Sequence, residues 1–480
     1  MAEESSTFDI SGGNNMIAPN VTSQQQIFYG DEFARKILGS KEKPLTVIVL
    51  GAGVDATLGL PTSASLVPRI VEFLETDDGK LIDATLRKAI GGVRFHFDKF
   101  VNNAIERLAK DLDKELFDIC RNINEELEHN ASLSDEHRKL GNLIVRLFRK
   151  IIDIKAGATI DPETESLIEE VFGTVVKDDT IIDFNHINYT DTFKNIIIEI
   201  LQKSMHESNN PILRHVYKNI LDIEQLLSQY FYGFYTGHVS YVKDYLYISW
   251  ILWAYLVNEE QRLGQFDLGE QADTSVKTNI YAQMRGKDCQ FITFNYTSFA
   301  RHVCDTTLYF HGSLMEYVDV ENKNDFRIPN LSDIDLVDFF KNHLAVEISF
   351  DSDRKAIPIP SFLPPLKLQT IISKHYIDTW YHASQVMIRA DKIIVLGCSF
   401  TAVDNYFCEM LRENRDAQIV IIDKDIETVC RNVCRVLQLD PNRYSRQIIA
   451  GKESRKYDNR VTIVHADLGE VNVEEFLDRK

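Results

Sequence analysis

The sequence predicts an α/β fold: a Rossmann-like, mostly parallel sheet with helices on both faces, interrupted by a large all-helical insertion. Short runs of β-branched and aliphatic residues alternate with helical segments near both ends of the chain, which is typical of such sheets. From about residue 81 to 260, helical periodicity replaces this alternation. We therefore expect a discontinuous α/β domain, residues 26–76 and 286–480, with residues 77–285 inserted as a regulatory or oligomerisation domain.

The charge, the cysteine spacing and the apolar segments of the chain argue against several classes of protein. A net charge of −19 argues against nonspecific binding to nucleic acid or to an anionic membrane surface. The seven cysteines include no CxxC pair, so neither a disulfide framework nor a zinc site is expected, and no metal ligands are assigned. Residues 1–25 are polar and lack signal-peptide features, which predicts a disordered tail and a cytoplasmic protein. The apolar segment 245–257 is too short to span a bilayer and predicts a buried helix.

The first strand, residues 46–50, leads directly into Gly51-Ala52-Gly53. Glycines at the carboxyl end of a buried strand allow backbone N–H groups to approach an anion, which is typical of a nucleotide loop. A dinucleotide-binding turn of the dehydrogenase type would continue into a long helix. Gly59 and Pro61 would break such a helix within two turns. The loop therefore predicts a nucleotide site of another kind.

The remaining elements follow from local patterns. Thr62 or Ser63 is expected to cap a helix that runs to residue 75. The proline-rich segment 357–367 predicts a loop. Further strands of the same sheet are predicted at residues 290–297, 306–313, 392–400, 418–425 and 460–467.

Polar residues or glycines follow most of these strands. In an open α/β sheet, ligands bind beyond the carboxyl ends of the strands, so these residues are candidates for one shared site. They are Gly51, Gly53 and Asp55 after the first strand, Asn295 and His311 after the next two, Gly397, Ser399 and Asp404 after the fourth, and Asp423 at the fifth.

Four segments resemble, in order, motifs of the sirtuin-like superfamily. The segments are VLGAGVDATLGLP (49–61), FNYT (294–297), LYFHGS (308–313) and GCSFTAVDNYF (397–407). The resemblance extends over residues 45–75 and 289–425 and is nearest to bacterial sirtuin-like proteins of anti-phage defence, which degrade NAD. The deacetylating members differ in two features: they carry a quartet of zinc cysteines, which this chain lacks, and an Asp-Phe-Arg run directly after the proline turn, where this chain has Thr62-Ser63-Ala64.

The resemblance implies an NAD glycohydrolase in which NAD is the substrate and no cofactor or zinc is needed. Asn295 would hold the nicotinamide ribose or the attacking water, and His311 would be the general base. The residues implied for NAD binding are Gly51, Ala52, Gly53, Asp55, Thr62, Tyr296, Gly397, Ser399, Asp404 and Asp423. A homo-oligomer and a trigger, either a partner ATPase or a phage-derived molecule, are the implied partners.

The chemistry is consistent with these residue types. Cleaving the nicotinamide–ribose bond develops oxocarbenium character, and the leaving group is already cationic, so a histidine base and an oriented water suffice. Simpler roles stay open: a ligand-free turn at Gly51 and Gly53, a structural His311, a turn cap at Asn295 and a helix-cap pair formed by Ser399 and Asp404. Two other functions also stay open: a non-catalytic NAD- or ADP-ribose-binding regulatory subunit, and a protein deacylase or ADP-ribosyltransferase.

Overall fold

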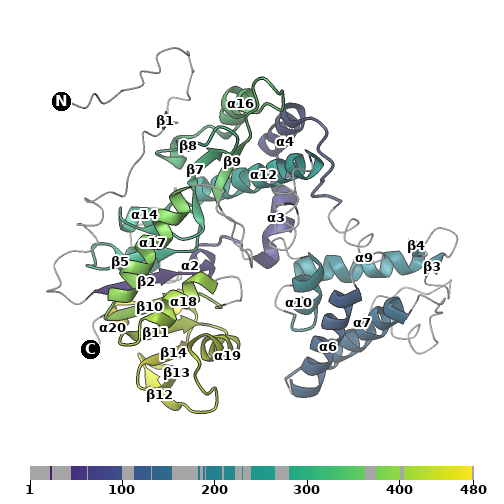
Figure 1. Ribbon diagram of the computed structural model, residues 1–480. Helices are drawn as coiled ribbons and strands as arrows, with labels where there is room; N and C mark the ends of the chain where they lie inside the picture. The colour runs from purple at the N-terminus through teal and green to yellow at the C-terminus, as the bar shows by residue number, and fades with distance from the viewer. Residues whose placement is uncertain are drawn as a thin grey trace, which may run out of the picture.

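A computed structural model shows the arrangement of the chain (Figure 1). The residues that the structure describes are 22–23, 45–61, 63–99, 113–130, 132–153, 182–183, 188–189, 191–207, 210–221, 230, 239–264, 280–362, 374–400 and 405–477.

The largest sheet has eight strands. Six neighbouring strands, which extend to one edge of the sheet, are parallel to one another. In spatial order the strands are β12 (Ser445–Ile449), β13 (Lys452–Tyr457), β14 (Val461–His465), β11 (Gln418–Asp423), β10 (Lys392–Leu396), β2 (Thr46–Leu50), β5 (Gln290–Thr293) and β6 (Leu308–Tyr309). The parallel strands, β14 through β6, fall within the six predicted runs. The antiparallel pair β12 and β13 extends the sheet beyond them.

Helices cover both faces of this sheet, which confirms the predicted α/β class. Val47 and Val49 face one core and Ile48 and Leu50 the other, all fully buried, because successive side chains of a strand point to opposite faces. The first core is closed by α17 (Lys374–Arg389), α18 (Asn405–Glu413) and α19 (Ile426–Leu437). The second is closed by α2 (Ala52–Thr57), α13 (Ile280–Met284), α14 (Phe299–Val303), the 3-10 turn η6 (Leu468–Glu470) and α20 (Glu474–Leu477).

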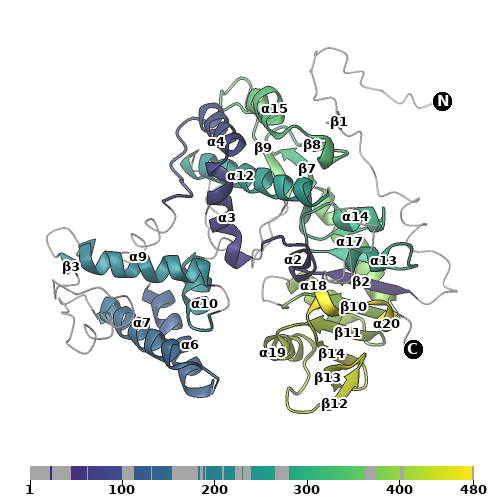
Figure 2. The same cartoon turned by 180° about the vertical axis from the view of Figure 1, so that it is seen from behind.

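Between β2 and β5 the described chain is almost entirely helical, as predicted. Besides α2 and α13, the helices are α3 (Ser63–Glu75), α4 (Asp77–Ile90), α6 (Asp113–His129), α7 (Asp135–Asp153), α9 (Asp191–His206), α10 (Leu213–Val216), the π-helix η2 (Tyr217–Leu221) and α12 (Val239–Gly264). The exception is an antiparallel pair of two-residue strands, β3 (Ile182–Asp183) and β4 (Asn188–Tyr189). Figure 2 shows α6, α7, α9 and α10 grouped together, away from the large sheet.

The predicted buried helix at 245–257 lies within α12. Trp250 and Trp253 on this helix are fully buried. Despite its length, α12 lacks the sustained apolar character of a bilayer-spanning segment, and the same holds for every other helix in the described part of the chain.

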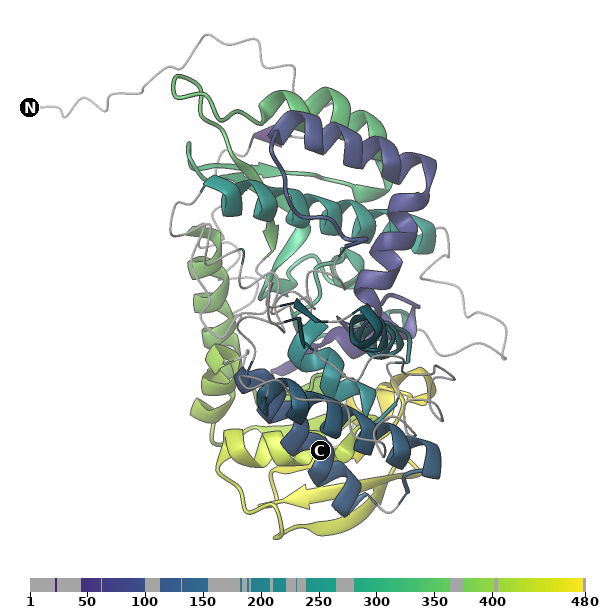
Figure 3. The same ribbon diagram turned by 90° about the vertical axis from the view of Figure 1, so that its right-hand side faces the viewer.

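A second, antiparallel sheet packs on α12, as Figure 3 shows. Its strands in spatial order are β1 (Thr22–Ser23), β8 (Asn324–Arg327), β7 (Gly312–Asp319) and β9 (Pro358–Phe362). The segment predicted as a proline-rich loop is thus partly an edge strand, and that prediction was wrong for residues 358–362. Pro358 and Pro360 are tolerated there because an edge strand has one row of N–H groups without a ladder partner. Short helical turns follow β8: η3 (Leu331–Asp333), α15 (Leu336–Asp338), η4 (Phe339–Leu344) and α16 (Ala345–Glu347).

The cores do not follow the predicted division at residue 286. One apolar cluster joins α3, α4 and α12 to the second sheet, so residues 312–362 pack with the helical part. The indole N–H groups of Trp250 and Trp253 donate to the carbonyls of Pro358 and Leu314, both at 2.8 Å. Within the predicted tail, residues 22–23 pair with β8; the rest of residues 1–25 lies outside the described part.

Candidate active site

The predicted site residues that the structure describes follow or end the parallel strands β2, β5, β6, β10 and β11, on both sides of the point where the order of these strands reverses. From β2 the chain continues to β5 and β6 on one side, and it later returns to β10, β11 and β14 on the other. The loops that follow β2 and β10 therefore diverge at this edge, which is where ligands bind in open α/β sheets. The ends of β5 and β6 lie directly beside them.

The glycines of the first loop pack against the loop after β10. The backbone N–H of Gly51 donates to the carbonyl of Leu396 at 2.8 Å, and that of Gly53 donates to Gly397 at 3.1 Å. A Cβ on Gly51 would lie 2.3 Å from the carbonyl oxygen of Gly397, a residue that itself has a positive φ of 62°. This close contact between two backbones requires glycine. It also engages two N–H groups that the sequence suggested for an anion.

The helix after the loop is short, as expected. α2 ends at Thr57, and Gly59 has a φ of 97°, a conformation that terminates the helix. Arg69 donates to the carbonyl of Gly59 at 2.7 Å and fixes the turn. Ala52, at the first position of α2, is exposed to solvent.

Asp55 lies beneath the loop and is 6% exposed. Its carboxylate accepts hydrogen bonds from the Tyr281 hydroxyl, from Thr297 Oγ1 at 2.7 Å and from Asn295 Nδ2 at 3.0 Å. Burial raises the pKa of this carboxyl from 3.8 to about 6, and the three hydrogen bonds oppose that rise. The structure therefore gives Asp55 a supporting position inside the protein, whereas the resemblance implied contact with NAD.

Asn295 is oriented by this network. Its Nδ2 donates to the carbonyl of Gly51 at 3.1 Å and to Asp55 at 3.0 Å, so both amide hydrogens face acceptors. This arrangement fixes which amide atom is nitrogen and leaves Oδ1 as an acceptor. Among the described residues, no group donates a hydrogen bond to Oδ1. The side chain as a whole is 7% exposed.

His311 follows β6 and is 4% exposed. Its ring stacks on Phe294, with centroids 5.0 Å apart and planes at 22°, and meets Phe310 edge-on at 5.6 Å. Phe294 immediately precedes Asn295, and its N–H donates to the carbonyl of Leu50 at 2.9 Å. The histidine ring is thus held by the same turn that carries the asparagine.

Tyr296 and Asp423 take other roles in the described structure. The ring of Tyr296 packs on Phe362 of the second sheet at 5.0 Å. Asp423 Oδ1 accepts from the N–H of Asp425 at 2.8 Å, closing a turn, and burial raises the pKa of Asp423.

Ser399 lies in the loop that follows β10. Ser399 is exposed, and its carbonyl accepts from Asn432 Nδ2 at 2.8 Å. Thr62 and Asp404 lie outside the described residues, so the predicted helix cap that pairs Ser399 with Asp404 has no structural description.

A second buried carboxylate was missed by the sequence analysis. Glu260, in α12, is 6% exposed and accepts from the backbone N–H of Ser298 at 3.0 Å and from the Ser298 hydroxyl. Burial raises its pKa from 4.5 to about 7, and Asp55 contributes to the rise. No local pattern singles out this glutamate among the polar residues near the end of α12. The only signal was the pair of hydroxyl residues, Thr297 and Ser298, directly after Asn295.

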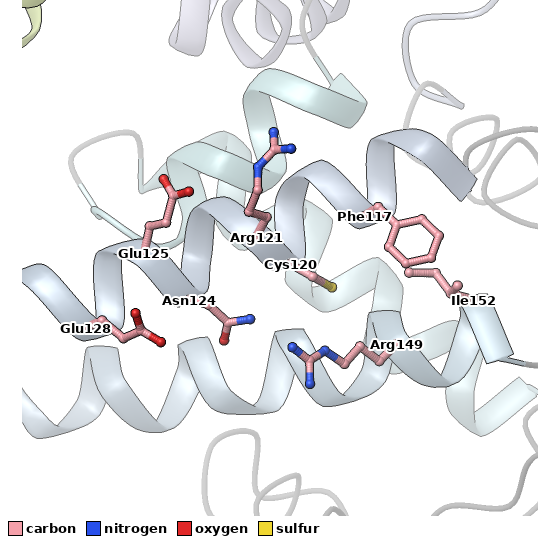
Figure 4. Close-up of a pocket in the computed structure, with 8 residues that line it drawn as sticks. All are labelled: Phe117, Cys120, Arg121, Asn124, Glu125, Glu128, Arg149 and Ile152. Carbon is pink, nitrogen blue, oxygen red and sulfur yellow. The ribbon is translucent and has the colours of Figure 1, made fainter.

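The described residues contain no group of three or more His, Cys, Asp or Glu arranged to hold a metal ion. A surface cavity of about 540 Å³ lies between α6 and α7, remote in sequence from the predicted site (Figure 4). Asn124, Glu128 and Arg149 project into the space between the two helices. The full lining is Phe117, Cys120, Arg121, Asn124, Glu125, Glu128, Arg149 and Ile152, which includes no predicted site residue.

Comparison with known proteins adds no relative. No protein-family model matches this chain, and no curated protein sequence matches it. The function must therefore be argued from the geometry and from the four sequence motifs.

Proposed function

We propose that this protein is an NAD glycohydrolase, which cleaves NAD to nicotinamide and ADP-ribose. The proposal includes a Rossmann-like site at the edge where β2, β5, β6 and β10 end, with NAD as substrate and with no cofactor. It also treats the helices between β2 and β5 as an insertion that regulates the site. The four ordered motifs and their placement at the strand ends support it.

The observation that carries the proposal is the orientation of Asn295. Both of its amide hydrogens are bound by Gly51 and Asp55, and no described residue donates to Oδ1, which is therefore the atom of this side chain that we assign to a ligand. An acceptor in this position suits a donor such as water or a ribose hydroxyl. A side chain that only closed a turn would not need contacts to Gly51, to Asp55 in α2 and to Tyr281 in α13 to fix its orientation.

The reaction needs few groups. A water that donates a hydrogen bond to Asn295 Oδ1 attacks C1′ of the nicotinamide ribose through its oxygen while the C1′–N bond breaks. The bonding electrons return to the pyridinium nitrogen, which leaves as neutral nicotinamide, and His311 accepts the proton of the water. His311 and Asn295 are nearly fully buried, so NAD reaches them only when neighbouring side chains move.

The same burial favours a second candidate of another class, a regulatory subunit that binds NAD or ADP-ribose without turnover. In that case the ligand binds at the strand ends without reaching Asn295 and His311, which stay buried. Both candidates bind the nucleotide, but only the glycohydrolase releases nicotinamide.

In the biological context that the motif resemblance implies, the proposed activity is a regulated effector of bacterial anti-phage, abortive-infection defence in the cytoplasm. Unregulated NAD loss is toxic, so a homo-oligomer or a partner ATPase or phage-derived trigger would control it. These partners belong to the proposal and not to the described structure.

The test compares nicotinamide release from NAD by the wild-type protein, by Asn295→Ala and by His311→Ala. His465→Ala is the matched control, since His465 ends β14 at the same edge of the sheet, outside the Asp55 network. We expect each site variant to lose at least about a hundredfold in kcat, and the control to keep activity. Full activity of His311→Ala would refute its role as base. ADP-ribose binding without nicotinamide release by wild type would favour the regulatory subunit.

A further inference from the structure

The turn that carries Asn295 is held at every residue from 295 to 298. Asp55 binds the side chains of Asn295 and Thr297. Between them, the carbonyl of Tyr296 accepts from the N–H of Leu314, at the start of the second sheet, at 2.8 Å. The last residue is held by α12, because Glu260 accepts both the N–H and the hydroxyl of Ser298. Three separate parts of the fold therefore converge on four consecutive residues.

α12 is the longest described helix and is itself firmly attached to the second sheet and its turns. Trp250 and Trp253 donate to the carbonyls of Pro358 and Leu314. Gln261, adjacent to Glu260, donates to the carbonyls of Leu331 and Ile334 at 2.7 and 2.8 Å. The helix also packs on α3 and α4 in one apolar core. Movement of the helical part relative to the large sheet must therefore change the contact of Glu260 with Ser298.

We propose that Glu260 is a positioning residue that transmits the position of α12 to the turn 295–298 and thereby to Asn295. For its catalytic consequence the inference rests on the proposed NAD hydrolysis; for its structural consequence it does not. A buried carboxylate with two donors from one residue is a rigid link, since charge-assisted hydrogen bonds are short and directional. The helical part thereby has a physical connection to the reacting groups through one side chain.

Two substitutions at Glu260 show whether its hydrogen bonds to Ser298 or its negative charge matters for the turn 295–298. Glu260→Ala leaves the N–H and hydroxyl of Ser298 without their acceptor. Glu260→Gln keeps one acceptor for the N–H, and its amide can donate to Ser298 Oγ. The Ser298 hydroxyl then turns to His302 Nε2, which lies 3.3 Å from that oxygen. The amide therefore preserves the link, and the alanine removes it.

Gln261→Ala is the matched control. It removes two hydrogen bonds from the same turn of α12, but these bonds lead to residues 331–334 and not to the site. A general loosening of α12 would appear in both variants. A specific connection appears only in Glu260→Ala.

The experiment measures hydrogen exchange in peptides covering residues 294–303 together with kcat and KM for NAD. In Glu260→Ala we expect exchange in this segment to accelerate about tenfold or more, and kcat to fall about ten- to a hundredfold with KM changing less than about threefold. Glu260→Gln should restore both within about threefold, and Gln261→Ala should alter neither.

Unchanged exchange in Glu260→Ala overturns the inference whatever the activity. Equal acceleration in Gln261→Ala also overturns it, because the effect is then not specific to Glu260. An inactive wild-type protein refutes the proposed function alone, and the inference is then decided by exchange. With an active wild type, a Glu260→Ala variant that exchanges faster but keeps kcat overturns the catalytic consequence.

Discussion

Replacing Glu260 by glutamine should stabilise the protein at alkaline pH. The carboxyl is harder to ionise in the folded chain, where its pKa is about 7, than at its ordinary value of 4.5. Its proton therefore contributes stability that is complete below pH 4.5 and is lost as the pH rises through 7. At about 1.4 kcal/mol for each tenfold change in the ionisation constant, the full loss is about 3 kcal/mol.

Glutamine avoids this loss but makes weaker hydrogen bonds to Ser298, at a cost of about 1 kcal/mol. At pH 8 we therefore expect Glu260→Gln to raise the free energy of unfolding by about 2 kcal/mol. At pH 6 the folded wild-type protein is largely protonated at Glu260, and the advantage should shrink by about 1 kcal/mol. Both pH values lie above the isoelectric point of the protein, which is about 5.2.

The assay is chemical denaturation followed by tryptophan fluorescence, because Trp250 and Trp253 are buried in the same helix as Glu260. Glu259→Gln is the control, since Glu259 neighbours Glu260 in α12 but is paired with the exposed Arg262 at 2.8 Å. It should change stability by less than about 0.5 kcal/mol at both pH values. The reasoning fails if Glu260→Gln is less stable than wild type at pH 8, or if its advantage does not depend on pH.

Further predictions concern the Asp55 network and the loop contact. Thr297→Val removes one donor from the buried Asp55 carboxylate, and it should raise the pKa of Asp55 and lower the free energy of unfolding by about 1–3 kcal/mol. Thr307→Val, which breaks bonds to carbonyls only, should cost about 1 kcal/mol in the same denaturation assay; an equal loss in both would contradict a special role for the carboxylate. Gly397→Ala should destabilise by at least about 3 kcal/mol, since it combines a left-handed φ with a Cβ 2.7 Å from the neighbouring loop. Gly451→Ala has a similar φ of 73° and open space, so thermal unfolding should show a loss of only about 1–2 kcal/mol; comparable losses at the two glycines would refute the close contact.

The large sheet was predictable because its central strands are buried on both faces. Runs such as Ile393–Leu396 must then be almost continuously apolar, which a single sequence displays directly. β12 and β13 escaped prediction because their composition, SRQII and KESRKY, is that of a solvent-exposed edge. β9 escaped because prolines usually indicate loops, and only the pairing with β7 shows that it is an edge strand.

The candidate site was predictable in its positions and not in its contacts. That Asn295 and His311 lie at one edge follows from strand order and parallel direction, both of which local patterns indicate. That Asp55 turns inward depends on Tyr281, which lies 226 residues away along the chain. The role of Gly51 depends likewise on Gly397, across the inserted helices. Contacts of this kind are tertiary and leave no periodicity in the sequence.

The chemistry of the two buried carboxylates argues that the turn 295–298 is held for its geometry and not for stability. Every donor to Asp55 and Glu260 among the hydrogen bonds described above is neutral: a phenol, a side-chain amide, two aliphatic hydroxyls and a peptide N–H. With no cationic partner among the residues that the structure describes, burial raises both pKa values toward neutrality, and each ionised carboxylate destabilises the folded protein. Apolar side chains of similar size would be more stable but could not orient Asn295 or bind Ser298. Since the destabilising groups surround one short turn, their common effect is to fix that turn, which is the requirement of a site that must present Asn295 Oδ1 in a single orientation.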